Sequence, residues 1–484
     1  MIVPLERCAE FNGISRRVKK GKGISLTSII MGTMYIINAC IGVLFLLCYA
    51  YQLFYIGVAI FKKKKPHTGK EVPHKFAVMI SARNEESVIG GLIDSIKKQD
   101  YPSELVTVFV VADNCTDNTA EISRKAGAVV YERFDTAHVG KGFALEFLLD
   151  NLKNDYPRDA FDAYFVFDAD NILMPNYITE MNKTYCDGYK AFTSYRNSKN
   201  YGDNWISAGY SLWFLREAKY LNNSRMILGT SCAISGTGFM IDRSLLEGED
   251  GYATWKYFLL TEDIEFTTSK IIDGEIIGYC DDAVFYDEQP VTFKQSWDQR
   301  MRWAKGFLQV FRNYGKNLIR DLFGKKKIGK EKRSGKSRFS CFDVTMTIMP
   351  AMILTGTVAV SDLVGAVVML CLGKFANAAT LIAMPILNAS LVVFLVGLIT
   401  TVTEWRSIHT KTYKKILFTF TFPFFMLTYI PIAMVAIFKK VEWKPISHSK
   451  VVTLDEIHAE GAEKESDRDS FSLGVSAKAP ENKE

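Results

Sequence analysis

Two apolar regions, one near each end of the chain, enclose a middle of mixed polarity. They are Ile29–Phe61 and Phe342–Phe438. A helix that crosses a bilayer needs about 20 apolar residues, and the first region is too long to be the core of a signal peptide. Hydrocarbon offers no partner to backbone polar groups, so spanning segments of this kind must be helical. The sequence therefore predicts an α-helical membrane protein with a large water-exposed domain between its apolar ends.

The charge pattern predicts the orientation of that domain. Lys62–Lys65 directly follow the first apolar region, and Lys and Arg usually mark the cytoplasmic end of a span. We therefore predict a multi-pass protein of the plasma membrane with a cytoplasmic catalytic domain. The net charge is +6, but the basic runs lie beside apolar segments. This arrangement predicts contact with anionic membrane lipids and argues against nucleic acid as a partner.

Several boundaries follow from composition, and some stay open. Ile29–Phe61 reads as one tilted span with an interfacial shoulder, with a hairpin of two short spans as the alternative. Pro423 and Pro431 allow the last apolar segment to be re-entrant. The predicted segments are a basic N-terminal part (1–28), a transmembrane segment (29–61), a soluble domain (74–315), a basic linker (324–338), a C-terminal region of three or four spans (342–438, with 362–377 either a connection or part of a span) and a disordered tail (451–484). The nine cysteines include no C-x-x-C pair, which argues against a disulfide framework or a zinc site.

The soluble middle alternates β-rich runs with helical patterns. Strands are predicted at 76–81, 106–113, 128–132 and 163–170, and helices at 86–99, 117–125 and 142–152. This alternation predicts βαβ units and a parallel sheet, hence an α/β fold. Ligands of such sheets bind outside the carboxyl ends of the strands. Asp113, Asp168 and Asp170 fall at those ends, so we expect them at one edge of the sheet.

Two of these aspartates suggest a metal site. Asp168 and Asp170 are one residue apart at the end of a buried strand, and carboxylate oxygens suit Mg²⁺ or Mn²⁺. A solvated turn with a helix-capping aspartate is the alternative. Asp113 has the equivalent place on its own strand, where it could contact a nucleotide or simply cap the next helix. Lys141, between two glycines at the start of a helical pattern, could hold a phosphate or lie exposed in a turn.

Two later clusters carry further chemistry. Asp263, in Thr261-Glu262-Asp263, could accept a proton from a hydroxyl, although the same residues also fit a helix cap. Gln299, Arg302 and Trp303 are spaced i, i+3, i+4 and share one helical face. Arg can bind a diphosphate through two hydrogen bonds, and Trp offers a flat plate to a sugar ring. The alternative is an amphipathic helix at the membrane surface.

Taken in order, these clusters resemble the membrane-integrated family 2 glycosyltransferases, the group of cellulose, hyaluronan, chitin and poly-N-acetylglucosamine synthases, and in particular its compact bacterial members. The resemblance covers about residues 76–310, and its most specific part is Q-x-x-R-W after T-E-D. The stretch Tyr286–Pro290 is also similar. The resemblance implies a GT-A fold, with a Rossmann-like, mostly parallel sheet, joined to an α-helical transmembrane region.

The resemblance also implies roles for individual residues. Asp263 would be the general base, and Trp303 would lie at the acceptor. The donor, a UDP-sugar, would be bound by Asp113, Lys141, Asp168, Gln299 and Arg302. Asp170, with Asp168, would hold Mg²⁺ or Mn²⁺. A single base without a covalent intermediate implies inversion, so an α-linked donor would give a β-linkage.

Three hypotheses remain for the activity. The first, which is the predicted activity, is a processive synthase that extends an exopolysaccharide or cell-surface polysaccharide. The second, an alternative, is a transferase that adds one sugar to a lipid-linked or repeat-unit acceptor. The third is an inactive membrane sensor of nucleotide sugars or a scaffold. The expected partners are the donor, a glycan or lipid-linked acceptor and membrane lipids; a polysaccharide product would also allow an accessory export subunit. The sugar itself depends on a few hydrogen bonds that the sequence does not place.

Overall fold

The computed structural model describes residues 25–64, 66–324, 327–328, 331–332, 334–446, 448 and 450–462. The central sheet consists of β1 (Phe76–Ala82), β2 (Val106–Asp113), β3 (Val129–Arg133), β4 (Ala163–Asp168), β5 (Ile172–Leu173), β6 (Ala191–Ser198), β7 (Phe239–Asp242) and β8 (Gly278–Asp287). The helices of the same domain are α4 (Ile89–Lys97), α5 (Thr119–Lys125), α6 (Lys141–Asp155), α7 (Tyr177–Cys186), α8 (Trp205–Arg216), α9 (Asn223–Leu228), α10 (Arg243–Leu246), α11 (Glu262–Asp273) and α12 (Phe293–Leu322), with short turns η1 (Ser103–Leu105) and η2 (Glu217–Asn222).

The sheet has the strand order β3-β2-β1-β4-β7-β6-β8-β5. Strands β1 to β4 pair in parallel, whereas β7 runs antiparallel to both β4 and β6. The parallel half confirms the prediction of βαβ units, and the other half makes the sheet mixed. Both faces are buried, as parallel strands require. Phe76, Val78 and Ile80 pack with α4 on one side, and Ala77 and Met79 pack with α6 on the other.

The turns after β1 and β2 are tied together at the carboxyl edge of the sheet. Asn84 and Asn114 have positive φ angles of 57° and 52°, a backbone region that asparagine tolerates better than most residues. Asn84 Oδ1 accepts a hydrogen bond from the Thr116 backbone N–H at 2.8 Å. The two strand ends therefore open side by side at the edge where polar groups were predicted to gather.

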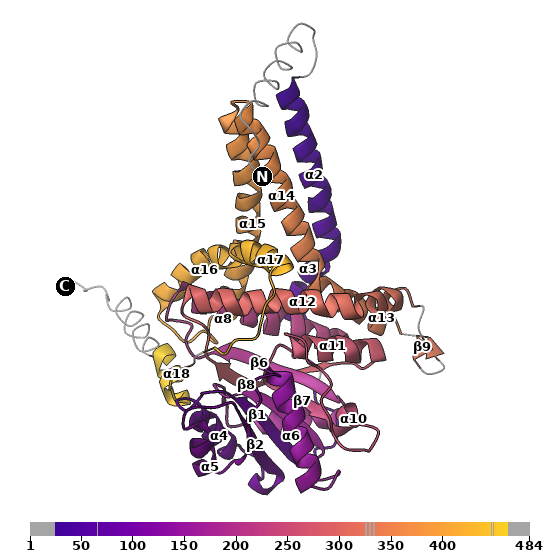
Figure 1. Ribbon diagram of the computed structural model, residues 1–484, viewed down its shortest axis with the longest axis vertical. Coiled ribbons are helices and arrows are strands. Elements are labelled where there is room, and N and C mark those ends of the chain that lie inside the picture. The colour runs from indigo at the N-terminus through magenta and orange to yellow at the C-terminus, as the bar shows by residue number, and fades with distance from the viewer. Residues whose placement is uncertain are drawn as a thin grey trace, which may run out of the picture.

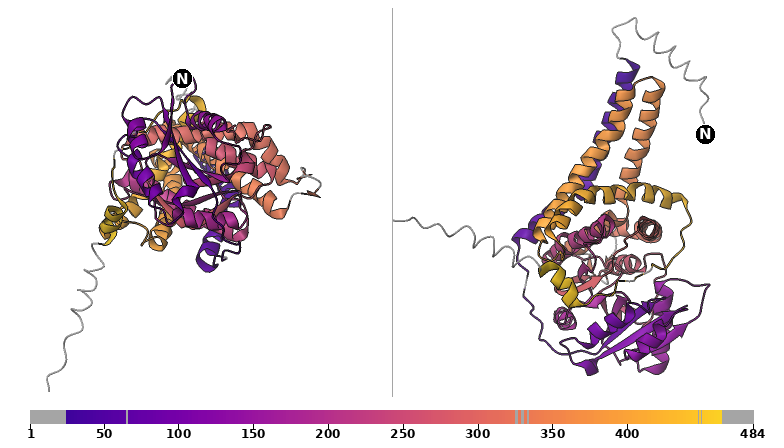
Figure 2. Two further views of the ribbon diagram at one scale, coloured as in Figure 1. Left: turned by 90° about the horizontal axis from the view of Figure 1, so that it is seen from below. Right: turned by 90° about the vertical axis from the view of Figure 1, so that its left-hand side faces the viewer.

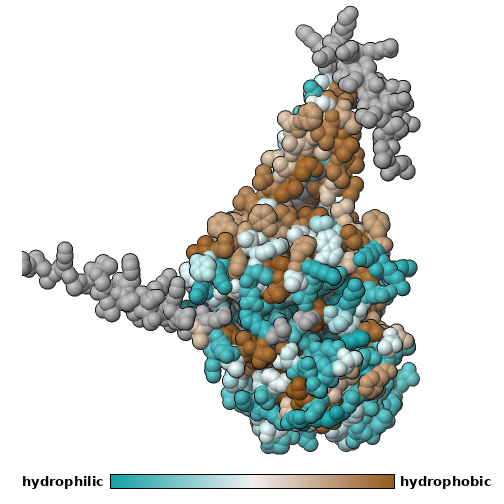
Figure 3. Space-filling view, turned by 60° about the vertical axis from the view of Figure 1, so that its left-hand side comes forward, coloured by the Kyte–Doolittle hydropathy of each residue, from teal (hydrophilic) through white to brown (hydrophobic). Residues whose placement is uncertain are grey.

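The apolar helices rise from the domain as a stalk. Figure 1 shows α2 (Leu26–Tyr49), α14 (Pro350–Cys371) and α15 (Phe375–Thr403) running together, and the surface of this stalk is hydrophobic (Figure 3). In Figures 1 and 2, α16 (Thr412–Leu427) and α17 (Tyr429–Phe438) lie across the base of the stalk, close to α12. Within the described residues, four helical stretches are long and apolar enough to cross a membrane, the last of them being α16 with α17.

The structure shows where helices begin and end in several segments whose boundaries the sequence left open. Helix α3 (Tyr51–Phe61) follows α2 after one residue and packs against α9. The two helices together form one of the stretches that are long enough to cross a membrane, so the hairpin of two short spans is not seen. Most of the stretch 362–377 belongs to α14. The linker contains α13 (Gly335–Ile348) and a small hairpin, β9 (Lys327–Ile328) and β10 (Glu331–Lys332). The basic N-terminal part up to residue 24 lies outside the described residues.

The predicted disorder of the tail was wrong for its first part. Residues 450–462 are described, and α18 (Leu454–Ala462) is helical. The Thr453 hydroxyl accepts from the Glu456 N–H at 3.3 Å, while the Glu456 carboxylate accepts from the Thr453 N–H at 2.8 Å. This reciprocal capping box starts the helix, and Ile457 is buried. The remainder of the tail, 463–484, lies outside the described residues.

A buried ion pair between α9 and α13 also holds two tyrosines of the first apolar region. Arg225 on α9 donates two hydrogen bonds of 2.8 Å to Asp343 on α13, and both side chains are almost fully buried. The hydroxyls of Tyr51 and Tyr55 donate to the same carboxylate at 2.7 Å. Asp343 is therefore a single acceptor for three side chains from two different helices, α3 and α9.

Removing that acceptor should destabilise the protein strongly. Asp343→Ala leaves the Arg225 guanidinium buried without its counter-charge, which typically costs about 3–5 kcal/mol. We expect a clearly lower midpoint of thermal unfolding in detergent. Asp94→Ala, an exposed position on α4, is the matched control and should leave the midpoint almost unchanged. Equal midpoints for the two variants would contradict this assignment.

Candidate active site

One cavity at the carboxyl edge of the sheet gathers all the residues that the sequence singled out. Its volume is about 160 Å³. Residues from β2, β4, α6, α11 and α12 line it, and among them are Asp113, Lys141, Asp168, Asp170, Asp263, Gln299, Arg302 and Trp303. These eight positions span almost two hundred residues of sequence. The three aspartates Asp113, Asp168 and Asp170 were expected together at this edge of the sheet, and they lie there with the other five residues.

The end of β4 provides two carboxylates in different environments. Asp168 accepts a hydrogen bond from Lys141 Nζ, which also donates to the Gly236 carbonyl at 2.7 Å. Asp170 is buried and accepts from the Glu288 backbone N–H at 2.6 Å. Burial would raise the pKa of Asp170, but the positive charges of His448 and Lys199 outweigh it and hold the pKa below its usual value. Asp170 therefore stays ionised, as a cation ligand must.

Two neighbouring side chains already hold the carboxylate of Asp113, at the end of β2. Its Oδ1 accepts from Arg133 Nη1 at 2.7 Å and from the Asn114 amide at 2.9 Å. The side chain is buried but still lines the cavity. Arg133 lies on the neighbouring strand β3, directly opposite Asp113 in the parallel register. Asp113 therefore presents a carboxylate that is already positioned, and whose charge is already balanced, to anything that enters this end of the cavity.

Two neighbouring acids begin α11. Glu262 is buried, and burial together with the charge of Asp263 raises its pKa to about 7. Burial also raises the pKa of Asp263, against the opposing effects of the Ile264 N–H and of the positive charges of Lys141 and Arg302. A side chain added at Gly236 would have its Cβ 3.9 Å from Asp263 Oδ2. Gly236 thus brings Asp263 beside the Lys141–Asp168 pair.

Helix α12 forms the wall of the cavity on the side of the apolar helices (Figure 1). The Thr292 hydroxyl caps its N-terminus by accepting from the Gln295 N–H at 3.3 Å. Arg302 Nη1 makes a long contact of 3.4 Å to the Leu260 carbonyl, just before α11. The Gln299 side-chain oxygen is buried without a hydrogen-bond partner among the described residues. Trp303 packs edge-on against Tyr210, with ring centroids 5.7 Å apart. Two polar side chains of this face are therefore available to a ligand.

Sequence reasoning missed several residues that line the same cavity. Arg196 on β6 donates through Nε to Asp287 Oδ2 at 2.7 Å, and burial raises the pKa of Asp287 to about 6 despite this partner. In the sequence, only the similarity of the stretch Tyr286–Pro290 to the family points to this region, and that similarity implies no role for Asp287. A lone arginine within a strand carries no pattern that would single it out.

The segment after α17 also reaches the cavity, and nothing in its sequence indicated this. Trp443 and His448 line it. His448 Nδ1 lies 2.9 Å from a carboxylate oxygen of Glu85, and the Arg83 guanidinium lies 5.6 Å from the Trp443 ring centroid. Burial would lower the pKa of His448, but Asp170, Glu85 and Glu288 outweigh it and raise the pKa to about 10. A positive charge therefore lies among the carboxylates of the cavity.

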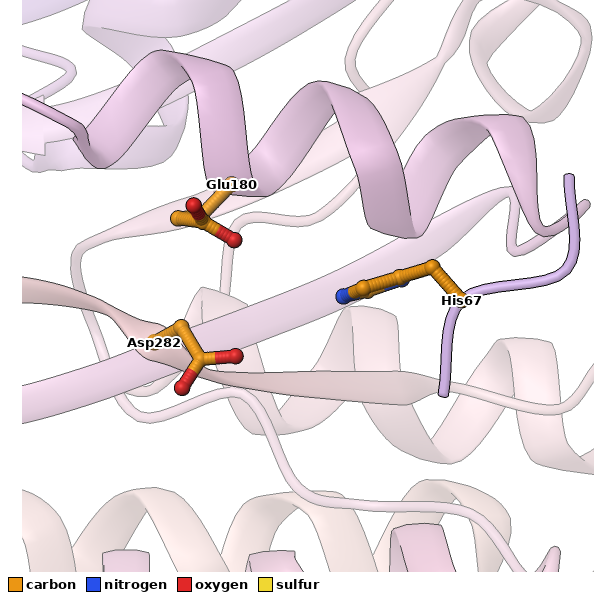
Figure 4. Close-up of side chains that lie close together, drawn as sticks. All are labelled: His67, Glu180 and Asp282. Carbon is orange, nitrogen blue, oxygen red and sulfur yellow. The ribbon is translucent and has the colours of Figure 1, made fainter. Parts of the chain in front are cut away.

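A second acidic cluster lies elsewhere. The ligand atoms of His67, Glu180 and Asp282 lie within 4.8 Å of one another, and Figure 4 shows the imidazole directed between the two carboxylates. Lys64 pairs with Asp282 at 2.5 Å, and Lys183 pairs with Glu180 at 2.9 Å. The lysines thus already balance both carboxylates. None of the three ligand-bearing residues lines the cavity described above, so this cluster is separate from the Asp168–Asp170 pair.

The residues at the end of β4 fit a divalent cation in their chemistry. Carboxylate oxygens are the ligands that Mg²⁺ and Mn²⁺ prefer, and the lowered pKa of Asp170 keeps one of them charged. Asp168 is bound to Lys141, so a cation at this place would share or replace that contact. Binding of Mg²⁺ or Mn²⁺ by Asp168 and Asp170 therefore stays a prediction, which the oxygen ligands and the negative charge of Asp170 support.

Comparison with known proteins agrees with this geometry. Residues 73–306 match the family model described as "Glycosyltransferase like family 2". The chain is 26% identical over 263 residues to the beta-monoglucosyldiacylglycerol synthase of Synechocystis, covering 53% of each protein. It is 24% identical over 269 residues to the poly-beta-1,6-N-acetyl-D-glucosamine synthase of Staphylococcus aureus, covering 54% of this chain and 59% of the relative.

The chain thus spans a little over half the length of these curated relatives. Among solved structures, the mannosyltransferase PcManGT from Pyrobaculum calidifontis, in complex with GDP-Man and Mn²⁺, aligns with a TM-score of 0.47 and 16% identity. The alignment covers 83% of this chain and 99% of that structure. With the family match extending over the whole sheet and all eight predicted residues, residues 73–306 of this chain form a family 2 glycosyltransferase domain.

Proposed function

We propose that the protein is an inverting glycosyltransferase that moves a sugar from a UDP-sugar to an acceptor hydroxyl at a membrane surface, with its catalytic domain in the cytoplasm. The observation that carries this proposal is that Asp263, Arg302 and the two aspartates at the end of β4 all line a single cavity. A base, a phosphate-binding arginine and a carboxylate pair are the groups such a transfer needs. The apolar helices beside the domain support its place at a membrane.

In this proposal, Asp263 accepts the proton of the acceptor hydroxyl as its oxygen bonds to the anomeric carbon. The bond from that carbon to the diphosphate breaks on the opposite face, so the configuration inverts. Negative charge grows on the departing UDP, and Arg302, Gln299 and Lys141 face the place where it develops. Interactions that strengthen as the charge grows lower the barrier. A bound Mg²⁺ or Mn²⁺, held by Asp170 and Asp168, would add positive charge against the same diphosphate.

A donor panel tests the proposal directly. Purified protein is supplied with UDP-glucose, UDP-N-acetylglucosamine, UDP-galactose or UDP-glucuronate, with Mg²⁺ or Mn²⁺, and released UDP is measured. We expect one donor to be turned over much faster than the others, and the release to depend on the cation. Failure to release UDP from any donor, in protein that is folded, would count against a transferase and in favour of the inactive sensor or scaffold.

The pKa of Asp263 predicts a pH dependence. The base works only when ionised, and burial raises its pKa, so kcat/KM should fall as the pH drops through that raised value, above the usual range near 4 for aspartate. Lys141 lowers the pKa of Asp263. Lys141→Met should therefore lower the overall rate and also shift the acidic limb of the profile to higher pH. A profile of kcat/KM against pH for both proteins checks this, and an acidic limb unmoved by the substitution would contradict it.

Two classes of acceptor are compatible with this chemistry. A growing polysaccharide fits the Q-x-x-R-W motif and the poly-N-acetylglucosamine synthase relative. Addition of one sugar to a membrane lipid fits the glucosyldiacylglycerol synthase relative. One structural observation favours the lipid: a second, largely apolar cavity on the other side of Trp303.

A further inference from the structure

Behind the candidate active site, an apolar cavity extends toward the membrane helices. Its volume is about 290 Å³, and α8, α12, α13, α14, α16 and α17 contribute to its wall. Four methionines line it, together with aliphatic and aromatic side chains. Methionine is flexible and adapts to irregular apolar shapes. Helices α14 and α17 belong to the apolar stretches that are long enough to cross a membrane, so this cavity lies where the domain meets the stalk.

Trp303 belongs to both cavities. It lines the one that contains Asp263 and Arg302, and it also lines the apolar one. The two faces of α12 explain this. Gln299, Arg302 and Trp303 face the first cavity, whereas Arg300, Ala304 and Phe307, spaced i, i+4, i+7, face the second. A molecule whose body lies in the apolar cavity would therefore have its end beside Trp303, close to the base.

Arg300 is the main charged side chain of the apolar cavity. It is 1% exposed. Its Nη1 donates to the Phe425 carbonyl at 3.0 Å and to the Thr428 hydroxyl at 2.8 Å, and the guanidinium lies 4.4 Å from the Phe425 ring centroid. These partners are uncharged, and Nη2 has no hydrogen-bond partner among the described residues. A buried donor without a partner is unfavourable, so an oxygen from an entering molecule would bind favourably here.

We propose that this cavity holds the hydrocarbon chain of a lipid acceptor, with Arg300 Nη2 donating to an ester or phosphate oxygen near the lipid head and the head hydroxyl reaching Asp263 past Trp303. A glycan fits the wall less well, because each sugar hydroxyl buried there without a partner would lose its hydrogen bonds to water. This inference rests on the proposed glycosyl transfer and narrows its acceptor. Diacylglycerol supplies both the long apolar chain and the hydroxyl whose proton passes to Asp263. A polyprenyl phosphate shares the chain and an oxygen-bearing head, but its phosphate oxygen would attack without giving a proton to Asp263.

The first test fills the cavity. Gly356 lines it, and a Cβ at this position would meet nothing within 4 Å, so Gly356→Phe adds volume without a backbone clash. With the full-length protein in vesicles, we expect at least a tenfold rise in KM for the lipid acceptor. Release of UDP by water in the absence of acceptor should be unchanged. Gly42→Phe is the matched control, since Gly42 lies on α2, has equal space around it and does not line the cavity.

The second test uses binding without catalysis. The full-length protein is irradiated with a diacylglycerol that carries a diazirine on its acyl chain, and the labelled peptides are identified. We expect labels on α12, α14 and α17, and a several-fold loss of labelling in both Gly356→Phe and Arg300→Gln. Labelling that is spread over the stalk and is equal in Gly356→Phe and Gly42→Phe would overturn the proposal.

The acceptors themselves separate the remaining outcomes. Vesicles containing diacylglycerol, vesicles containing polyprenyl phosphate and a soluble oligosaccharide are compared with the same donor. If sugar is transferred to either lipid and Gly356→Phe impairs that transfer, the result supports the apolar cavity as the lipid site and shows which of the two lipids is the acceptor. Transfer to the oligosaccharide alone, with UDP release intact, overturns the lipid site but leaves the glycosyltransferase in place. Absence of UDP release with every donor would instead remove the proposed function on which the site depends.

Discussion

Replacing Asp263 with asparagine should lower the rate of sugar transfer by about 10²–10⁴-fold, the usual contribution of a general base. The substitution keeps the size and hydrogen-bonding shape of the side chain and removes only its ability to take a proton. Binding of UDP should change little, because in our proposal Asp263 faces the acceptor and not the diphosphate. Turnover and UDP affinity, measured on the same preparation, separate the two effects.

The matched control for this prediction lies on the same helix. Asp273 ends α11 and is exposed, so Asp273→Asn makes the same chemical change away from the cavity. We expect it to keep nearly full activity. If Asp263→Asn were equally active, the base would have to be another residue, and the neighbouring Glu262, whose pKa is raised to about 7, would be the next to test.

Replacing Arg302 should have the second large effect. Arg302→Lys keeps the positive charge but loses the planar pair of donors that matches a diphosphate. Donors directed at developing charge typically contribute about 10²–10³-fold to kcat, so we expect a loss of that order with weaker binding of UDP. Steady-state kinetics and titration of UDP measure both.

Arg312 provides the comparison for Arg302. It lies on the same helix, exposed to solvent, and Arg312→Lys should behave like the unmodified protein. A substitution at Arg302 that lowered thermal stability as much as activity would point to a structural role in holding the Leu260 carbonyl. An unchanged UDP affinity and rate would contradict the role that we propose for this guanidinium.

The first half of the sheet could be predicted from the sequence because its signals are local. Predicted strands at 76–81, 106–113 and 163–170 differ from β1, β2 and β4 by two residues at most. Each is a short apolar run that ends in a polar residue, which is typical of buried parallel strands. The second half was not predicted. Strand β7 has four residues and pairs with β4 and β6 across long stretches of chain, and no local pattern indicates such pairing.

The same division holds for the site. Asp168, Asp263 and Arg302 lie in recognisable motifs, whereas Arg196 and His448 reach the cavity only through tertiary packing. Asp113 shows a further limit, since its partner Arg133 depends on the register between β2 and β3. The apolar cavity could not be predicted from the sequence for a similar reason. Its wall combines six helices that are spread along the chain from α8 to α17, and no local pattern indicates that they meet.

In our proposal, one cavity binds the diphosphate of the donor and brings its sugar to Asp263. An experimental structure of the full-length protein in a lipid nanodisc, with UDP and Mn²⁺, tests it most directly. We expect density for the diphosphate between Arg302 and the aspartates at the end of β4, with Asp263 on the acceptor side of the cavity and away from the diphosphate. Nucleotide bound at any other place, with this cavity left empty, would contradict it.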